Sequence, residues 1–343
     1  MKLKKLPATI ESCMKKIIKL LLRPVFRAIR SFLIIYFRIR AFYPVWFYWL
    51  NRKNRLLYRQ WYVKSKLQID ATGRRVINDL KRDGIAVISL DQLFPGRPIF
   101  KGLKSYTDEL VARAATRTTK EFLRYLWEAD PVLNLNDPFV KLALERKILD
   151  IVNSYLDMCA KFYYLTLNVT VPVIAGSSAV QSQRWHRDPE DKRMCKVFLY
   201  LTDVDSASGP FTYVKGSQMG GRWRHIFGQK PPAGFYPPPG AVEKIVPPDA
   251  MMASIAPAGT LIFCDTSGLH FGGYATQKER IMFTGGYCPS SIAWPIRFKY
   301  PPNFADEMRR AGLDPVQRYA LNYDQSAFVK FAFKKVKKGF RYG

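Results

Sequence analysis

The stretch Gln183-Arg-Trp-His-Arg-Asp-Pro-Glu-Asp-Lys-Arg-Met-Cys-Lys-Val-Phe-Leu-Tyr-Leu-Thr202 combines a candidate metal-binding pair with a strand-like run. His186 and Asp188 are two residues apart, so on an extended backbone their side chains point to the same side. The apolar and aromatic run that follows, Lys196 to Leu201, is typical of a strand. An imidazole and a carboxylate can therefore reach one ion from one strand edge.

Further short strand-like runs lie on both sides of this stretch, separated by Gly, Pro and Ser. Many short strands with turn signals between them indicate a sandwich or a barrel. Helical periodicity occurs instead over residues 72–83, before a strand-like run at 84–90, and dominates from about 105 to 161. We therefore expect a mainly β protein with flanking helices. The other expected strands are 163–173, 211–214, 260–264 and 281–287.

His270 follows the expected strand at 260–264, and Arg280 begins the next one. Two histidines and one carboxylate occupy one face of an octahedral iron(II), which leaves three positions for substrate ligands and dioxygen. If His270 ends one strand and Arg280 starts the next, the guanidinium can point into the same cavity and bind a carboxylate. A His-x-Asp pair alone is more often a surface pair. Together with His270 and Arg280, it predicts a metal site.

Four stretches around these residues carry a family resemblance: Trp185-His-Arg-Asp188, Val197-Phe-Leu-Tyr-Leu-Thr-Asp-Val-Asp205, Ser208-Gly-Pro-Phe-Thr-Tyr-Val-Lys-Gly-Ser217, and Ala258-Gly-Thr through His270 to Arg280. They resemble the phytanoyl-CoA dioxygenase family, a branch of the iron(II)- and 2-oxoglutarate-dependent oxygenases. The resemblance covers roughly residues 83–289 and implies a double-stranded β-helix core, the cupin-like jelly roll.

The resemblance also implies roles for the four residues. His186, Asp188 and His270 match the Fe(II) ligands, and Arg280 matches the residue that pairs with the distal carboxylate of 2-oxoglutarate. The implied activity is a hydroxylation that uses O2 and releases succinate and carbon dioxide. The family loop Pro-Gly-Ser-His reads Lys215-Gly-Ser-Gln218 here, a departure that bears on the substrate more than on activity. Asn168 is a further candidate contact to 2-oxoglutarate.

The charge balance predicts an anionic partner. The chain has 55 Lys and Arg against 27 Asp and Glu, a formal net charge of +28, which favours nucleic acid, anionic headgroups or an acidic substrate. The DNA-repair branch of these oxygenases adds a second arginine, but the matching position here is Gly286, so we expect no nucleic acid. We expect a small or lipid-linked anionic substrate. The cluster Arg184, Arg187, Lys192, Arg193 and Lys196 is interleaved with acids and is interpreted as a solvated rim, with phosphate or carboxylate recognition as the alternative.

Residues 1–62 form an expected basic, amphipathic extension. Arg38 and Arg40 interrupt its apolar runs, which disfavours a membrane span. An interfacial helix with Tyr43, Trp46, Tyr48 and Trp49 at headgroup depth is the favoured interpretation, and an extension packed on the domain is the alternative. Residues 63–300 are the expected oxygenase domain with its helical insert. Residues 301–343 form a basic tail, either a second anionic contact or a solvated helix.

The five cysteines are scattered and none has CxxC spacing, which argues against disulfides and a structural zinc site. We expect a reducing, cytoplasmic location with peripheral membrane contact. GxGxxG, Walker A, HExxH and GxSxG elements are absent from the sequence, which disfavours nucleotide-binding, zinc-protease and serine-hydrolase functions. A jelly-roll binding protein without catalysis is the remaining alternative to the oxygenase.

Overall fold

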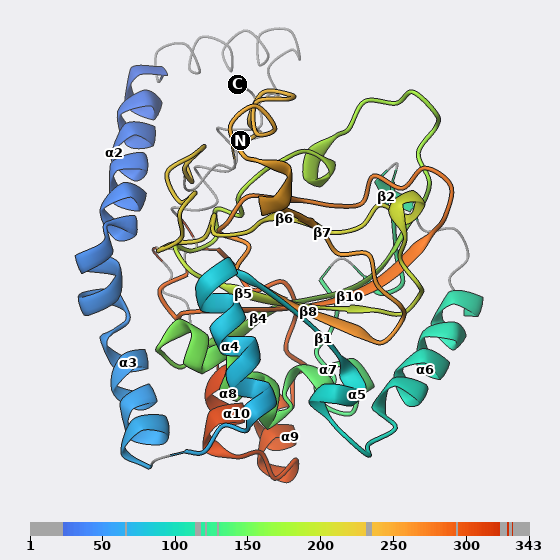
Figure 1. Ribbon diagram of the computed structural model, residues 1–343. Helices are drawn as coiled ribbons and strands as arrows, with labels where there is room; N and C mark the ends of the chain where they lie inside the picture. Colours follow the sequence, from blue (N-terminus) through green and yellow to red (C-terminus); the bar gives the residue numbers. More distant parts are fainter. Residues whose placement is uncertain are drawn as a thin grey trace, which may run out of the picture.

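The computed structural model describes residues 23–65, 67–113, 118–120, 122–128, 130–230, 235–292, 294–322, 328 and 331. Its centre is a sheet of seven strands in the order β1-β8-β5-β10-β4-β3-β2, paired antiparallel throughout (Figure 1). The strands are β1 (Ile85–Ser89), β2 (Thr118–Lys120), β3 (Leu123–Tyr125), β4 (Lys161–Thr170), β5 (Cys195–Tyr200), β8 (Thr260–Cys264) and β10 (Arg280–Cys288).

A second sheet of three antiparallel strands packs against the first. Its order is β7 (Met251–Ala253), β6 (Thr212–Val214) and β9 (His270–Phe271). Side chains from both sheets form one buried apolar cluster between them, which includes Phe198 of β5, Ile262 of β8 and Tyr213 of β6. The two sheets therefore form a sandwich, as expected for a mainly β protein.

Helices cover the opposite face of the large sheet, where α4, α8 and α10 gather on one side (Figure 1). The main core lies there, because alternation along β5 turns Val197 and Leu199 towards the helices while Phe198 and Tyr200 turn towards the second sheet. The helices of this domain are α4 (Ala71–Asp83), α5 (Leu90–Leu93), α6 (Ile99–Arg113), α7 (Pro138–Ala143), α8 (Arg146–Leu156), α9 (Phe304–Arg310) and α10 (Pro315–Leu321), with short 3-10 turns at Gln181–Gln183, Ser206–Ser208 and Pro248–Ala250.

Local signals explain where α4 begins and ends. The Asp70 carboxylate accepts a 2.7 Å hydrogen bond from the Gly73 amide, which caps the first turn. Gly84 ends the helix in the left-handed region, with φ at 79°, and glycine adopts this conformation without a steric penalty. The chain then enters β1 directly, so the expected helix at 72–83 and strand at 84–90 are confirmed.

The expected strands at 163–173, 196–201, 211–214, 260–264 and 281–287 are confirmed as β4, β5, β6, β8 and β10. The expectation that helix dominates from 105 to 161 is only partly right. Strands β2 and β3 interrupt the stretch, and β3 pairs with β4 through Leu123 and Thr170. β3 forms because it pairs with β4, far along the chain, and β2 in turn pairs with β3. The helical periodicity of a single segment cannot predict such pairing.

The extension consists of α2 (Arg23–Ala41), a π-helical turn at Val45–Leu50, α3 (Arg52–Tyr58) and a second π-helical turn at Arg59–Lys64. Trp46 is only 2% exposed, and both it and Tyr62 belong to the main core. The placement of Trp46 at headgroup depth is therefore wrong, because its indole donates a hydrogen bond to the buried Asp191 carboxylate. Tyr43, Tyr48 and Trp49 are exposed. Among the described helices, none has the length and apolar character needed to cross a membrane.

Candidate metal centre

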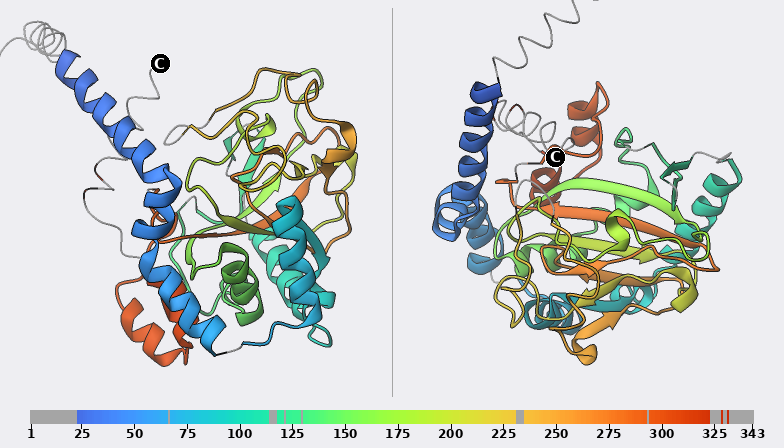
Figure 2. Two further views of the ribbon diagram at one scale, coloured as in Figure 1. Left: turned by 60° about the vertical axis from the view of Figure 1, so that its left-hand side comes forward. Right: turned by 90° about the horizontal axis from the view of Figure 1, so that it is seen from above.

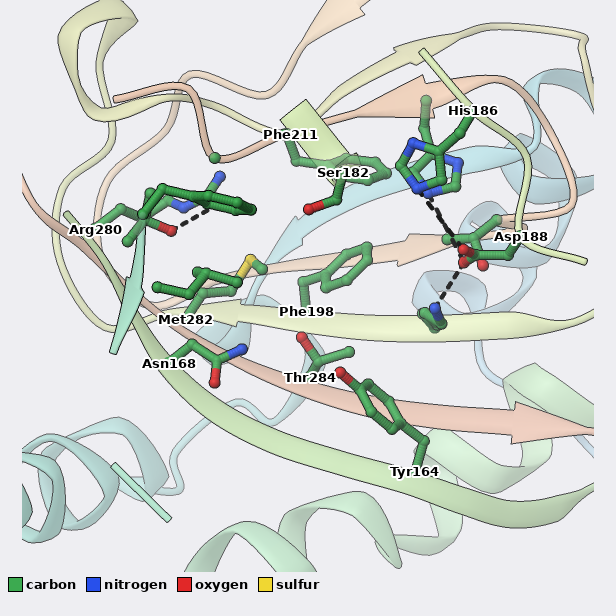
Figure 3. Close-up of a pocket in the computed structure, with 18 of the residues that line it drawn as sticks. Tyr164, Asn168, Ser182, His186, Asp188, Phe198, Phe211, Arg280, Met282 and Thr284 are labelled. Atoms are coloured by element: carbon green, nitrogen blue, oxygen red, sulfur yellow. Dashed lines mark hydrogen bonds and ion pairs between the residues drawn. The ribbon is translucent and has the colours of Figure 1, made fainter. Parts of the chain in front are cut away.

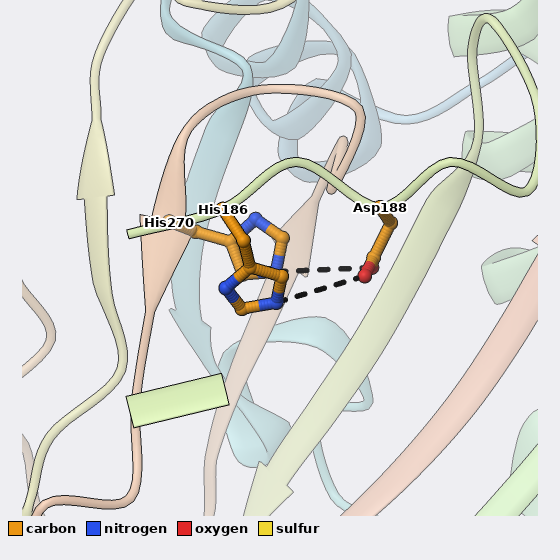
Figure 4. A group of neighbouring side chains, drawn as sticks. All are labelled: His186, Asp188 and His270. Carbon is orange, nitrogen blue, oxygen red and sulfur yellow. Dashed lines mark ion pairs between the residues drawn. The ribbon is translucent and has the colours of Figure 1, made fainter. Parts of the chain in front are cut away.

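Two backbone segments bring the three predicted ligands together. His186 and His270 form an antiparallel bridge, in which each amide donates to the other residue's carbonyl at 2.9 and 3.0 Å. The Asp188 amide donates to the Thr266 carbonyl at 2.9 Å, so the pairing extends along both segments. The pair His186 and Asp188 therefore faces His270 across the bridge (Figure 4), as the spacing of the residues predicted.

The donor atoms are close enough to share one ion. Nε2 of His186 lies 3.7 Å from Asp188 Oδ1, and Nε2 of His270 lies 3.7 Å from Asp188 Oδ2. All three ligand atoms lie within 4.8 Å of one another. Donors bound to one ion at about 2.1 Å lie roughly 3–3.5 Å apart, so a small contraction suffices. Two histidines and one carboxylate are a donor set that suits iron(II).

Backbone carbonyls orient both imidazoles. Nδ1 of His186 lies 2.8 Å from the Arg184 carbonyl, and Nδ1 of His270 lies 3.0 Å from the Gly268 carbonyl. Because a carbonyl only accepts, these contacts place the proton on Nδ1 and leave the Nε2 lone pair free for an ion. Burial lowers the pKa of His270 to about 3, with the neighbouring His186 adding to the effect, so its imidazole is neutral at neutral pH.

Lys196 is a member of the site that sequence reasoning assigned to a solvated rim. Its ammonium group lies 2.6 Å from Asp188 Oδ2, and both side chains are largely buried. Burial raises the pKa of Asp188, but the charge of Lys196, followed by those of the two histidines, outweighs it and holds that pKa below its usual value. Lys196 shares the strand face of Phe198 and Tyr200, and this alternation was the signal that could have placed it inward.

Arg280 lines the same cavity as the three ligands. The cavity has a volume of about 210 Å³, and Figure 3 shows Arg280 on the far side from His186 and Asp188, with Phe198, Phe211 and Met282 between. The Arg280 side chain is only 3% exposed. Its terminal nitrogens donate to the Gly209 carbonyl at 2.6 Å and to Thr170 Oγ1 at 3.2 Å. Burial lowers its pKa.

Within the described residues, no acidic side chain pairs with Arg280, and its Nε lacks a hydrogen-bond partner. A buried cation without a counter-charge is unfavourable unless a ligand supplies one. Asn168 also lines the cavity, and its side-chain oxygen likewise lacks a partner. The orphaned Arg280 donor fits an anionic ligand in the cavity, whereas Asn168 Oδ1 is an acceptor and fits a hydrogen-bond donor.

Arg187, between the two ligands, is buried and does not belong to a solvated rim. Its guanidinium donates to the carbonyls of Ser217, Trp223, Ile226, Phe227 and Ser267, at distances between 2.6 and 3.2 Å. The residue therefore ties the ligand-bearing segment to the loop at 217–227 and to the turn before His270. Successive side chains on an extended backbone point to opposite sides. His186 and Asp188 therefore point into the cavity, whereas Arg187 between them points into this loop.

Gln218, at which this sequence differs from the family loop, has a side chain that does not reach the cavity. The Gln218 amide donates to the Lys81 and Arg82 carbonyls at the end of α4, and Gln218 is not among the residues that line the cavity. Ser217 beside it accepts a hydrogen bond from the Leu269 amide at 2.8 Å. This loop therefore supports the turn that presents His270. His225 is exposed and lies outside the cavity.

The fold and site together define a β-sandwich protein with a candidate facial centre of two histidines and one carboxylate. No protein-family model matches the chain, and no curated protein sequence matches it significantly. Similar solved structures include the epimerase SnoN with Fe3+, alpha-ketoglutarate and nogalamycin RO, which is 17% identical over 71% of this chain and 93% of that chain, with a TM-score of 0.49.

Two other similar structures are EctD from S. alaskensis with bound Fe and HygX from Streptomyces hygroscopicus with nickel and 2-oxoglutarate. EctD is 17% identical over 69% of this chain and 85% of that chain, with a TM-score of 0.47. HygX is 17% identical over 63% of this chain and 87% of that chain, with a TM-score of 0.43. These likenesses are too slight to transfer a ligand or an activity, so the functional argument rests on the site itself.

Proposed function

We propose that the protein is an iron(II)- and 2-oxoglutarate-dependent dioxygenase that hydroxylates a C–H bond of a small or lipid-linked anionic substrate at a membrane surface. The observation that carries the proposal is one cavity with two complementary ends. Three convergent metal donors lie at one end, and a buried arginine that pairs with no described acidic side chain lies at the other. This pair of features matches a co-substrate that chelates a metal through one end and carries a carboxylate at the other.

Each residue has a defined task in this proposal. His186, Asp188 and His270 hold the iron on one face, and Arg280 anchors the distal carboxylate of 2-oxoglutarate. Asn168 is a further proposed contact to the same molecule through its amide nitrogen, which donates to Thr166 Oγ1 in the structure. When bound, the iron couples the oxidation of 2-oxoglutarate by O2, which gives succinate and carbon dioxide, to insertion of the second oxygen atom into the substrate C–H bond.

The surrounding side chains keep the site ordered and dry. Phe198, Phe211 and Met282 line the space between the two ends, and they exclude water from the path between the metal and Arg280. Lys196 keeps the Asp188 carboxylate ionised and oriented before metal binds. Because Lys196 is a second cation in the cavity, it also favours an anionic substrate.

The antiparallel sandwich with the ligands at its inner face supports a double-stranded β-helix of the jelly-roll type. The four site residues fall within 63–300, which we propose as the oxygenase domain, with 1–62 and 301–343 as extensions. Gly286 is packed so closely that a Cβ there would lie 2.9 Å from Tyr164 Cβ. This position therefore has no room for the second arginine of the DNA-repair branch, which supports an assignment without nucleic acid.

The test is iron(II)-dependent release of succinate from 2-oxoglutarate by the purified chain. We expect slow release without substrate, its loss in His186→Ala, and a much higher 2-oxoglutarate requirement in Arg280→Ala. His225→Ala and Arg310→Ala are matched controls, because both residues are exposed and lie outside the cavity. If release is absent, binding of iron and 2-oxoglutarate is measured directly. Failure to bind both would refute the oxygenase and leave a β-sandwich binding protein.

A further inference from the structure

An apolar stripe runs along the outer face of α2 and continues to Tyr43. Its successive members up to Phe42 are three or four residues apart, and Tyr43 lies four residues after Ile39, so they share one face of the helix. Each is between 40% and 62% exposed, although each carries a large apolar side chain: Val25, Ile29, Phe32, Ile35, Ile39, Phe42 and Tyr43. Among the described residues, Leu33 and Phe37 on another face of α2 pack against Trp294. Figure 2 shows α2 extending beyond the sheets.

The charge beside the stripe has a single sign. The sequence has no Asp or Glu between Ser12 and Ile69, whereas Arg23 to Lys64 include 10 Lys and Arg. Several of these residues, such as Arg27 and Arg38 on α2 itself, are exposed. A helix with a broad apolar face and only cationic polar groups has the character of an interfacial helix on an anionic bilayer. A water-exposed face of a globular domain would carry charges of both signs.

A basic pocket adjoins the end of this stripe. Tyr43 contributes to its wall, together with Lys81, Lys192, Arg193 and Arg224, and its volume is about 540 Å³. Among the described residues that line it, Asp157 is the one with an acidic side chain. Four cations against one carboxylate leave an excess of positive charge, and such an arrangement binds phosphate.

Arg193 is the best-defined cation of this pocket. Its side chain is 12% exposed and lies 3.6 Å from Asp157. It also donates to the Tyr155 carbonyl, while its buried Nε has no partner. The neighbouring Lys192 forms no ion pair among the described residues. Lys81 also pairs with Asp157, at 3.4 Å, so the cations that no described carboxylate engages are Lys192 and Arg224.

We infer that this side of the protein docks on an anionic phospholipid bilayer, with the α2 stripe inserted at the interface and the basic pocket holding a headgroup phosphate. The inference deepens the membrane-surface part of the proposed function, and its vesicle test does not depend on the oxygenase activity. Such docking would also link the bilayer to the metal centre. Trp46 follows the stripe, and its indole donates to Asp191, which lies three residues after the proposed ligand Asp188. A docked α2 is thus joined to the segment that carries two of the three metal ligands.

The test is sedimentation of the full-length chain with vesicles of phosphatidylcholine alone or mixed with phosphatidylglycerol. We expect binding only to the mixed vesicles, with an affinity that falls as salt rises. The double variant Phe32→Ser/Ile39→Ser should bind about tenfold more weakly or worse, because two apolar side chains no longer insert. Ile174→Ser/Ile255→Ser is the matched control, since these residues are 84% and 57% exposed on the sandwich domain.

The pocket is tested separately by the double variant Lys192→Gln/Arg224→Gln. Its control is Arg75→Gln/Arg310→Gln, which removes the same charge from exposed positions elsewhere. We expect the pocket pair to weaken vesicle binding several-fold more than its control. Equal losses would refute the headgroup site. Equal binding to both vesicle types, or an unaffected stripe variant, would refute bilayer docking. Binding of inorganic phosphate at the pocket without vesicle binding would also refute it and leave a soluble phosphate ligand. Unchanged thermal midpoints confirm that the variants fold.

Discussion

Replacement of Lys196 by Met should lower the folding stability of the metal-free protein much more than that of the metal-bound protein. Lys196 places an ammonium group 2.6 Å from Asp188 Oδ2. At that distance and an effective dielectric constant of about 20, 332/(20 × 2.6) gives an attraction of roughly 6 kcal/mol. Part of this is offset because Met does not need the desolvation that buried Lys requires. The net loss expected for removing one partner of a buried pair is about 3–5 kcal/mol.

The thermal consequence follows from the size of the chain. An unfolding entropy of about 2.1 cal/mol/K per residue over 343 residues is roughly 0.7 kcal/mol/K. A loss of about 3–5 kcal/mol therefore lowers the melting temperature by about 4–7 °C. A divalent ion bound by Asp188 replaces the lost positive charge, so Mn2+ should raise the melting temperature of Lys196→Met by several degrees more than that of wild type.

Differential scanning calorimetry of both proteins, with and without Mn2+, measures these quantities. Lys278→Met is the matched control, because Lys278 pairs with Asp205 at the exposed surface, where such pairs contribute little. The reasoning is refuted if Lys196→Met melts within about 1 °C of wild type without metal. It is also refuted if Mn2+ stabilises the variant no more than it stabilises wild type.

Three further predictions concern the supports of the site. Arg187→Met should lower the unfolding free energy in urea by about 3–5 kcal/mol, because it removes the hydrogen bonds from a buried guanidinium to five carbonyls; a loss below about 1 kcal/mol would contradict this. Gly268→Ala should weaken Mn2+ binding in a titration, because its Cβ would collide with the Tyr213 hydroxyl and lie 2.7 Å from Ser217 Oγ; Gly102→Ala in α6 has open space and should bind normally. Burial raises the pKa of Asp191 to about 7, so the native state holds this proton more tightly than the unfolded chain and loses stability as pH rises from about 4 to 7. In Asp191→Asn the unfolding free energy should fall less steeply with pH over that window, by up to about 1.4 kcal/mol per pH unit. Urea melts at pH 5 and 7 measure this, and an equal change of unfolding free energy in both proteins would contradict the assignment.

Much of the fold and site could be predicted because it depends on short stretches of chain. The helix before β1, six of the strands and the common side of His186 and Asp188 follow from periodicity, capping and two-residue spacing. The cationic and aromatic character of α2 was also readable from composition. The burial of individual residues in the extension could not be predicted in this way, since Trp46 lies in the core while Trp49 is exposed.

The sequence by itself determined which residues could bind a metal and a carboxylate, and which strands would carry them. Only the tertiary structure decided that Lys196 faces Asp188, that Arg280 has no acidic partner in the part of the chain that the structure describes, and that Arg187 binds a distant loop. Strand periodicity defines two faces of each strand but does not say which face meets which neighbour. That choice comes from pairing between segments far apart in the chain, such as β5 with β10 and β8, and burial on those faces then sets the charge and pKa of each group.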